Sequence, residues 1–348
     1  MASALMSAAC GSSSPGSTDD ALVFNVGSAV STVVMSPYTV VPQSNGYWKD
    51  AGVDVEVQNA NGSTAALQLL LSGRADIVIS GTDTTYSTAA QNKDLRVVSL
   101  IPGNVWRIGV PESASISDVE QLRGKTIGVI SLTSGSYTYG RSIVRAAGLD
   151  PDSDVSWLPI GTGTQAAEAI DSGRVQAFSA YDGPLDLVSA VTQEKLRALP
   201  SALDDIAGSM GYVTTKKVLE TRRDDIEAFL KGSYQGMEFS LANPDAAIQI
   251  YWEQFPDQKP AGMAQTDAVA EAKHSVTNAW ANRFGVGDDG MRGYLTDENV
   301  EEAANFFTKY QITEGEVPYK EVVDLDLNKT ANTFDAAQVK AAATAWKP

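Results

Sequence analysis

The sequence has few of the residues that most often perform catalysis or hold metals. Its 348 residues include one cysteine and one histidine. A disulfide needs two cysteines, and a metal site usually combines several histidine, cysteine or carboxylate ligands at short spacing. The histidine, His274, lies in a helical pattern, where a lone histidine is most often a surface or core residue. Because nucleophile-elbow, phosphate-loop and dinucleotide motifs are also missing, we expect no enzyme activity, metal or cofactor.

Long apolar runs and net positive charge are also missing. No segment approaches the roughly 20 apolar residues of a transmembrane helix, and 43 acidic against 26 basic residues give a net charge of -17. Such a negative field repels nucleic acids and anionic lipid surfaces. With 43% hydrophobic residues, the chain can still form two packed cores of ordinary size. We therefore predict a folded protein without a nucleic-acid partner.

The single cysteine, Cys10, lies between small residues and a Gly- and Ser-rich stretch. This arrangement resembles the cleavage site of bacterial lipoproteins, in which the cysteine carries the lipid. Residues 1–20 would then comprise the remainder of a signal peptide, up to residue 9, and a lipoprotein tether. Ser7 departs from the lipoprotein pattern, in which leucine is commonest three residues before the cysteine. The alternative is a free cysteine in a disordered terminus.

One supersecondary unit occurs twice in the chain. Residues 72–81 read SGRADIVISG, and residues 172–181 read SGRVQAFSAY. In each copy a helical segment ends at a glycine, and a short apolar strand then runs into small and polar residues. This order is half of a parallel α/β unit. The two copies predict two similar lobes, each with ligand-binding loops at its strand tips.

We predict an α/β fold with two lobes, each a doubly wound and mostly parallel sheet with helices on both faces. Lobe 1 comprises residues 21–109 and 214–348, and lobe 2 comprises residues 110–213. The chain would cross between the lobes near residues 108–111 and 212–215. Helical patterns predict C-terminal helices over residues 222–242, 244–255, 266–283 and 297–310. A cleft between the lobes follows, because the strand tips of both sheets are expected to face it.

The candidate ligand-binding residues lie in loops that follow predicted strands and begin helices. Polar side chains there, together with the free N–H groups of helix starts, can bind an oxyanion; they are Ser63, Thr64, Thr82, Asp83, Thr84, Ser134, Ser136 and Asp182. Aromatic rings in or beside the same loops can cover a ligand face; they are Tyr38, Trp106, Tyr137 and Tyr181. For each hydroxyl the alternative is a helix cap, and for each ring it is packing. The two aspartates could also receive an amine, with capping as the alternative for Asp182.

The order of several segments resembles a known family. Residues 35–38 (MSPY), 46–57 (GYWKDAGVDVEV), 122–129 (LRGKTIGV), 147–151 (AGLDP) and the two SGR units are similar to the substrate-binding proteins of ABC importers. Among these proteins, the sequence most resembles the subgroup for taurine, alkanesulfonates, nitrate, aromatic acids and thiamine pyrimidine precursors. Residues 293–297 (GYLTD) are similar to the start of that subgroup's C-terminal helix. The resemblance implies the type 2 periplasmic-binding-protein fold and a position for Asp182 at the cleft.

The resemblance also implies a function. It implies capture of a small polar or aromatic anion, such as a sulfonate, an aromatic carboxylate or a pyrimidine-like compound, by hinge closure and delivery to ABC permease and ATPase subunits. The protein is then expected to be an extracytoplasmic monomer, in the periplasm or at the outer face of the membrane, and bound to the membrane only through a lipid on Cys10. The alternatives are an extracellular sensing module of a signalling receptor and, less favoured, an enzyme like thiamine-pyrimidine synthase. The cysteine-rich motif of that enzyme is missing here.

Overall fold

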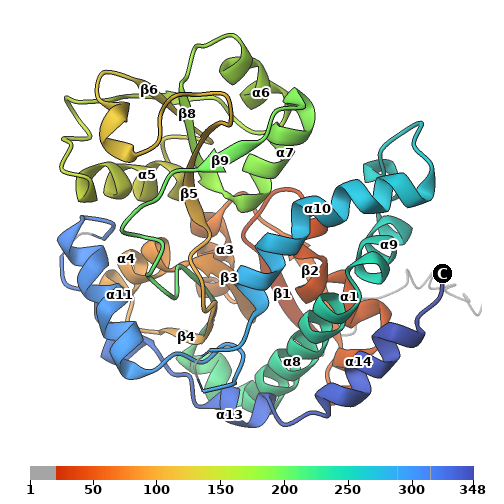
Figure 1. The fold of residues 1–348 in the computed structure, drawn as a ribbon. Helices are drawn as coiled ribbons and strands as arrows, with labels where there is room; N and C mark the ends of the chain where they lie inside the picture. Colours follow the sequence, from red (N-terminus) through yellow and green to blue (C-terminus); the bar gives the residue numbers. More distant parts are fainter. Residues whose placement is uncertain (1–20, 288, 314) are drawn as a thin grey trace, which may run out of the picture.

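The computed structural model describes residues 21–287, 289–313 and 315–348, and it shows an α/β fold built on two five-stranded sheets (Figure 1). The first sheet has the strand order β2-β1-β3-β10-β4, and the second has the order β7-β6-β8-β5-β9. In each sheet four strands run in the same direction, and one strand, β10 or β5, is antiparallel to both of its neighbours. The predicted two-sheet α/β class is confirmed, with mixed sheets.

The strands are short and mostly buried. Those of the first sheet are β1 (Leu22–Val26), β2 (Val55–Asn59), β3 (Ile77–Gly81), β4 (Leu95–Leu100) and β10 (Met210–Thr215). Those of the second sheet are β5 (Trp106–Pro111), β6 (Thr126–Val129), β7 (Ser156–Pro159), β8 (Ala177–Tyr181) and β9 (Leu196–Ala198). The two copies of the repeated unit supply β3 and β8, which occupy the centre of the two sheets.

Helices follow the strands and cover the sheets. In the N-terminal part they are the 3-10 helix η1 (Val33–Tyr38), α1 (Val40–Ser44), α2 (Tyr47–Ala51), α3 (Ser63–Leu71) and α4 (Thr82–Gln91). Around the second sheet they are η2 (Val119–Leu122), α5 (Gly135–Ala146), α6 (Thr164–Asp171) and α7 (Asp182–Thr192). The C-terminal helices are α8 (Lys216–Ala242), α9 (Pro244–Gln254), η3 (Pro256–Gln258), α10 (Gln265–Phe284), α11 (Asp297–Lys309), α12 (Tyr319–Val322), α13 (Leu327–Ala331) and α14 (Ala336–Ala345).

The alternating pattern of β1 fixes the position of helix α8. Leu22, Phe24 and Val26 lie on one face of the strand and are almost completely buried. The ring of Phe24 packs 4.9 Å from that of Phe229 on α8. Burial of such side chains contributes roughly 1.5–3 kcal/mol each, so this face anchors the C-terminal helices to the first sheet.

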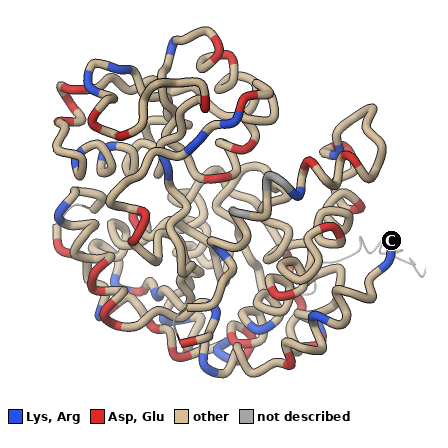
Figure 2. Tube along the Cα trace, in the orientation of Figure 1, with Lys and Arg blue, Asp and Glu red and all other residues tan. Residues whose placement is uncertain are grey.

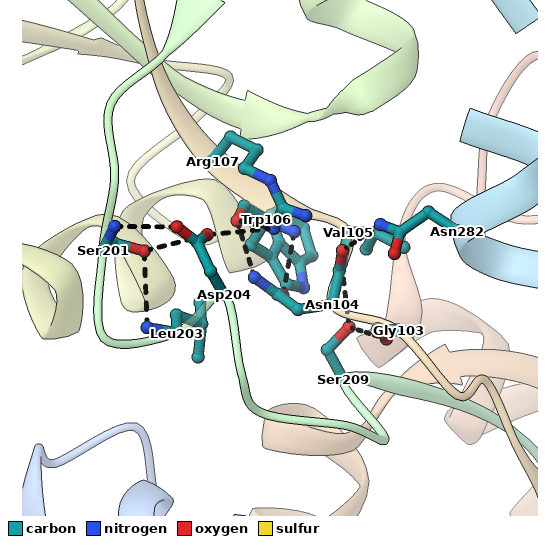
Figure 3. A network of polar contacts seen from close by, with 10 residues as sticks. All are labelled: Gly103, Asn104, Val105, Trp106, Arg107, Ser201, Leu203, Asp204, Ser209 and Asn282. Carbon is teal, nitrogen blue, oxygen red and sulfur yellow. Dashed lines mark hydrogen bonds and ion pairs between the residues drawn. The ribbon is translucent and has the colours of Figure 1, made fainter. Parts of the chain in front are cut away.

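Two segments connect the sheets and lie against each other. Because β5 already belongs to the second sheet and β10 to the first, the connections are residues 101–105 and 199–209. The crossings expected near residues 108–111 and 212–215 are instead parts of these strands. The Val105 amide donates to Ser209 Oγ at 3.2 Å, and Asn282 Nδ2 on α10 donates to the Asn104 carbonyl at 2.7 Å (Figure 3). A helix from the C-terminal part therefore holds the point where the chain passes between sheets.

The C-terminal helices also reach the second sheet. Helix α10 packs against α7, while α11 ends beside α5, where Ser142 Oγ and Arg145 Nη1 both donate to the Tyr310 carbonyl, at 3.1 and 2.8 Å. Acidic and basic residues are spread along the chain of both lobes (Figure 2). Within the described ranges, no helix combines the length and apolar character needed to cross a membrane.

Candidate functional site

The strand tips of the two sheets meet at Thr82 and Tyr139. Thr82 starts α4 directly after β3, and Tyr139 lies in the second turn of α5. The Thr82 hydroxyl donates to the Gly208 carbonyl at 2.7 Å and lies 3.4 Å from the Tyr139 hydroxyl. Both side chains are fully buried. The contact joins the first sheet to the second at the point where the sequence predicted facing loops.

Asp83 is a buried carboxylate beside this contact. Its side chain is 5% exposed. Burial raises the pKa of Asp83 to about 6, although hydrogen bonds from the backbone and hydroxyl of Thr84 act in the opposite direction. Burial also raises the pKa of Tyr139 well above the ordinary tyrosine value, and the nearby Asp83 adds to this increase. Asp83 is therefore a polar group in desolvated surroundings, as a ligand contact would be.

The other hydroxyl residues of the first sheet have different surroundings. Ser63 Oγ accepts a hydrogen bond of 3.0 Å from the Gly81 amide and so ties α3 to the end of β3. Thr84 is partly buried, and Thr64 is exposed on the first turn of α3. The structure thus brings Ser63 and Thr84 near the tip of β3 and leaves Thr64 at the surface.

Ser134 and Ser136 organise the start of α5 in the second sheet. Ser136 is fully buried, and its Oγ accepts a hydrogen bond of 3.0 Å from the Ile130 amide. Ser134 Oγ donates to the Ser131 carbonyl at 2.9 Å and contacts Ser136 Oγ. Both serines therefore shape the loop between β6 and α5.

The helices that begin at the strand tips lack side-chain caps. Among the described residues, no side-chain cap bond is formed at the N-cap positions of α3 to α7, which are Gly62, Gly81, Ser134, Gly163 and Tyr181. By contrast, helices α8, α9, α11 and α14 are capped by Thr215, Asn243, Thr296 and Asp335. The alternative that the hydroxyls of the strand-tip loops serve as helix caps is therefore not seen.

Three aromatic rings form a stack at the start of β5. Trp106 lies parallel to Tyr139, with ring centroids 4.9 Å apart. Tyr181, at the end of β8, meets Trp106 edge-on at 5.8 Å. A Cβ on Gly135 would lie 2.6 Å from the Trp106 ring, so the absence of a side chain there lets α5 approach this close. The predicted residues Trp106 and Tyr181 are thus neighbours.

The structure places the other two predicted rings elsewhere. Tyr38 is 2% exposed and packs against Phe24, Tyr212 and Phe284 in the core of the first sheet. Tyr137 packs edge-on against Trp157 within the second sheet. Tyr38 still lies close enough to Arg283 for that guanidinium to influence its pKa, which burial raises above the ordinary value.

Asp182 forms an ion pair with a residue that the sequence did not single out. Arg283 on α10 is 4% exposed, its Nε lies 3.5 Å from Asp182 Oδ2, and its guanidinium lies 5.7 Å from the centroid of the Tyr181 ring. Asp186, one turn further along α7, lies near both charges. Sequence reasoning missed Arg283, Tyr139 and Asp186 because the approach of distant helices places them there, without a local motif.

Two surface hollows lie away from these residues. One, of about 640 Å³, runs beside β2 and is lined by residues that include Thr39, Glu56 and Phe255. The other, of about 750 Å³, lies between α4 and α12 and is lined by residues that include Lys93 and Glu321. Neither hollow is lined by an expected ligand-binding residue.

Solved structures show the class of fold. The periplasmic aliphatic sulphonate binding protein SsuA of Escherichia coli is 17% identical, with a TM-score of 0.64, over 87% of this chain and 97% of that one. The desulfurization enzyme DSZB is 14% identical, with a TM-score of 0.55, over 90% and 98% of the two chains. The chain therefore has the periplasmic-binding-protein fold, which occurs in both a binding protein and an enzyme.

The chain belongs to the NMT1/THI5-like family, whose model matches residues 37–247. The riboflavin-binding protein RibY of Chloroflexus aurantiacus is 23% identical over 277 residues, which cover 78% of each chain. YtlA of Bacillus subtilis is 22% identical over 205 residues, and this match spans 57% of the chain and 60% of YtlA. The order of the sequence segments indicated a resemblance to substrate-binding proteins of ABC importers, and this resemblance is confirmed at the level of the family.

Proposed function

We propose that the protein is the extracytoplasmic solute-binding component of an ABC importer and that its ligand binds between the two sheets. One observation carries the proposal: side chains from both sheets and from α10 form an unbroken series of contacts. The series runs from Thr82 through Tyr139, Trp106 and Tyr181 to Arg283. Buried polar groups and rings from two lobes are what a ligand cleft requires. Membership of the NMT1/THI5-like family supports this proposal. The similarity to the binding proteins SsuA and RibY supports it as well.

The proposed mechanism is closure of two lobes around the ligand. The sheets move the expected lobe bounds: lobe 1 comprises residues 21–100 and 210–348, lobe 2 comprises residues 106–198, and residues 101–105 and 199–209 connect them. Ligand contacts from both lobes favour the closed population over the open one. The proposed contacts are Ser63, Thr82, Asp83, Thr84, Trp106, Ser134, Ser136, Tyr181 and Asp182, to which we add Tyr139 and Arg283. Three residues expected from the sequence are left out, because Thr64 lies at the surface, Tyr38 lies in the core of the first sheet and Tyr137 packs against Trp157. Permease and ATPase subunits would receive the ligand, and the binding protein would act as a monomer.

The proposed ligand classes are sulfonates, aromatic carboxylates and pyrimidine-like compounds. The N-termini of α3, α5, α6 and α7, whose N-cap residues form no side-chain cap bond, support a ligand with acceptor atoms. At α4 the Thr82 amide already donates to the Ser209 carbonyl at 3.2 Å. The rings of Trp106 and Tyr181 support a ligand with a planar part. Lipid attachment at Cys10, which lies outside the described residues, remains part of the proposal.

A binding screen with one variant from each sheet tests the proposal. Thermal unfolding is measured with sulfonates, aromatic carboxylates, pyrimidines and riboflavin, since a ligand that binds only the folded state raises the melting temperature. The affinity of the best compound is then measured by calorimetry for Asp83→Asn and Asp182→Asn. Asp83→Asn is expected to weaken binding tenfold or more, which is roughly 1.4 kcal/mol. Asp182→Asn is expected to do the same for a ligand that donates a hydrogen bond to its carboxylate.

Asp152→Asn is the matched control. Asp152 belongs to the second sheet's half of the chain but pairs with Arg141 at the surface, so its loss should leave ligand affinity unchanged. A screen of all four compound classes without a binder, or a binder that neither site variant affects, contradicts the proposed function.

A further inference from the structure

Arg283 is a buried cation, and two of its nitrogen atoms have no hydrogen-bond partner among the described residues. Its residue is 4% exposed, and it lies between α7 of the second sheet and the aromatic core of the first. Of the atoms that the structure describes, none forms a hydrogen bond with Arg283 Nε or Nη2, or with Asp182 Oδ2. The 3.5 Å ion pair between Nε and Oδ2 satisfies neither atom. A buried donor or acceptor without a partner is destabilising, so a bound molecule that satisfies both is favoured.

The indole of Trp106, which lies beside the ring of Tyr181, carries a third polar group without a hydrogen-bond partner. Trp106 Nε1 is buried and forms no hydrogen bond with the described residues. Trp106 and Arg283 lie on Tyr181, with their contacts to its ring at 5.8 and 5.7 Å. Beside Tyr181 the structure therefore holds unsatisfied donors on Arg283 and an unsatisfied acceptor on Asp182, and the indole of Trp106, with its own unsatisfied donor, meets the same ring edge-on. A molecule that lies here needs acceptor atoms for the donors and one donor for the carboxylate.

The charges around Arg283 restrict the ligand further. Asp182 and Asp186 lie one turn apart on α7 and both face the single guanidinium, with Tyr38 and Tyr181 as the other titratable groups nearby. Burial and the charge of Asp182 raise the pKa of Asp186 to about 7. Arg283 is already paired with Asp182, so an added anion would meet the charge of Asp182 without an unpaired cation to balance it. An added cation would meet Arg283 itself, and an unpaired buried charge is costly.

We propose that Arg283, Asp182 and Trp106 recognise a neutral, planar ligand with an acceptor and a donor side by side on one edge, as in the C=O and N–H of a lactam ring. The acceptor would take hydrogen bonds from the guanidinium, and the donor would give one to Asp182 Oδ2. The inference rests on the proposed function and narrows its ligand class: simple sulfonates and carboxylates would be disfavoured, although the hydroxyl-rich loops alone pointed to an oxyanion.

Matched compound pairs test this inference. The lactams are pyrimidin-4-one, lumazine and lumichrome. Each is compared with its form methylated at every ring N–H (3-methylpyrimidin-4-one, 1,3-dimethyllumazine and 1,3-dimethyllumichrome), which keeps the ring and removes the donors. Benzoate and benzenesulfonate represent simple anions. We expect a lactam to give the largest rise in melting temperature, and methylation to weaken its binding at least tenfold by calorimetry. If an anion binds more tightly than every lactam, if no lactam binds, or if methylation has no effect, the inference is wrong.

Variants separate this inference from the proposed function. Asp182→Asn should weaken lactam binding at least tenfold and should not weaken the binding of benzoate or benzenesulfonate, because it removes a negative charge. Asp152→Asn, at the exposed pair with Arg141, should change neither. Since Asp182→Asn keeps the size of the side chain, it also avoids the loss of folding that removal of Arg283 could cause. Tight anion binding that Asp83→Asn weakens would overturn the lactam inference and leave the solute-binding proposal intact.

Discussion

Asp186 shows how the charges on α7 respond to their surroundings. The pKa of its carboxyl is raised to about 7, first by burial and then by the charge of Asp182, whereas Arg283 acts in the opposite direction. In the unfolded chain an aspartate titrates near 3.9. Between about pH 4 and pH 7 the folded protein therefore holds a proton on Asp186 that the unfolded chain has lost.

This difference predicts a pH dependence of stability at a single residue. Because the folded state binds the proton more tightly, the stabilising effect of protonated Asp186 is present below about pH 4 and is lost as the pH rises to about 7. The loss amounts to at most about 1.4 kcal/mol per pH unit. Asp186→Asn removes the titration, so the free energy of unfolding of this variant, relative to wild type, should rise from pH 4 to 7 and then level off. Urea unfolding at a series of pH values measures it, and a constant difference across this range would contradict the assignment.

At the scale of elements, α10 connects parts of the molecule that the strands alone do not. Two adjacent residues near its end reach different partners: Asn282 bonds the Asn104 carbonyl in the segment between the sheets, and Arg283 pairs with Asp182 on α7. A Cβ on Gly103 would lie 2.4 Å from the Asn282 side chain, which shows how closely the helix and the connecting segment approach. We therefore expect α10 to govern how the two sheets are held relative to each other.

Asn282→Ala tests the contribution of this helix. The variant leaves the buried Asn104 carbonyl without the hydrogen bond that α10 supplies, which should lower the free energy of unfolding by about 1–3 kcal/mol. Thr277→Ala is the control on the same helix, because Thr277 is exposed and its hydroxyl donates to the Lys273 carbonyl one turn earlier, within α10 itself. Denaturant unfolding compares the two variants. Equal, small effects would show that the contact at Asn104 does not stabilise the fold.

The elements themselves were largely predictable, since local patterns determine them. The repeated units gave β3 and β8 with their preceding helices, and the segment predicted as a helix from residue 222 lies within α8, whose backbone is non-helical at Arg222. The tip of β3 placed Thr82 and Asp83 where the sheets meet. By contrast, Tyr139 and Arg283 reach the site only through the packing of α5 and α10, which depends on contacts between residues far apart in the sequence.

At the scale of the whole molecule, the two sheets face each other through buried side chains. Thr82, Asp83, Trp106 and Tyr139 are each less than 9% exposed, and the C-terminal helices contact the second sheet through both α10 and α11. In the proposed mechanism an open population admits the ligand and a closed one retains it, so contacts of this kind between the sheets are the ones that closure would use. The account therefore depends on where the ligand binds relative to the two sheets.

A crystal structure of the protein with the tightest compound from the screen tests this claim most directly. The account predicts that the compound lies between the sheets and contacts Thr82 or Asp83 on one side and Trp106 or Asp182 on the other. A compound bound in the hollow beside β2, or held by residues of one sheet alone, would contradict it.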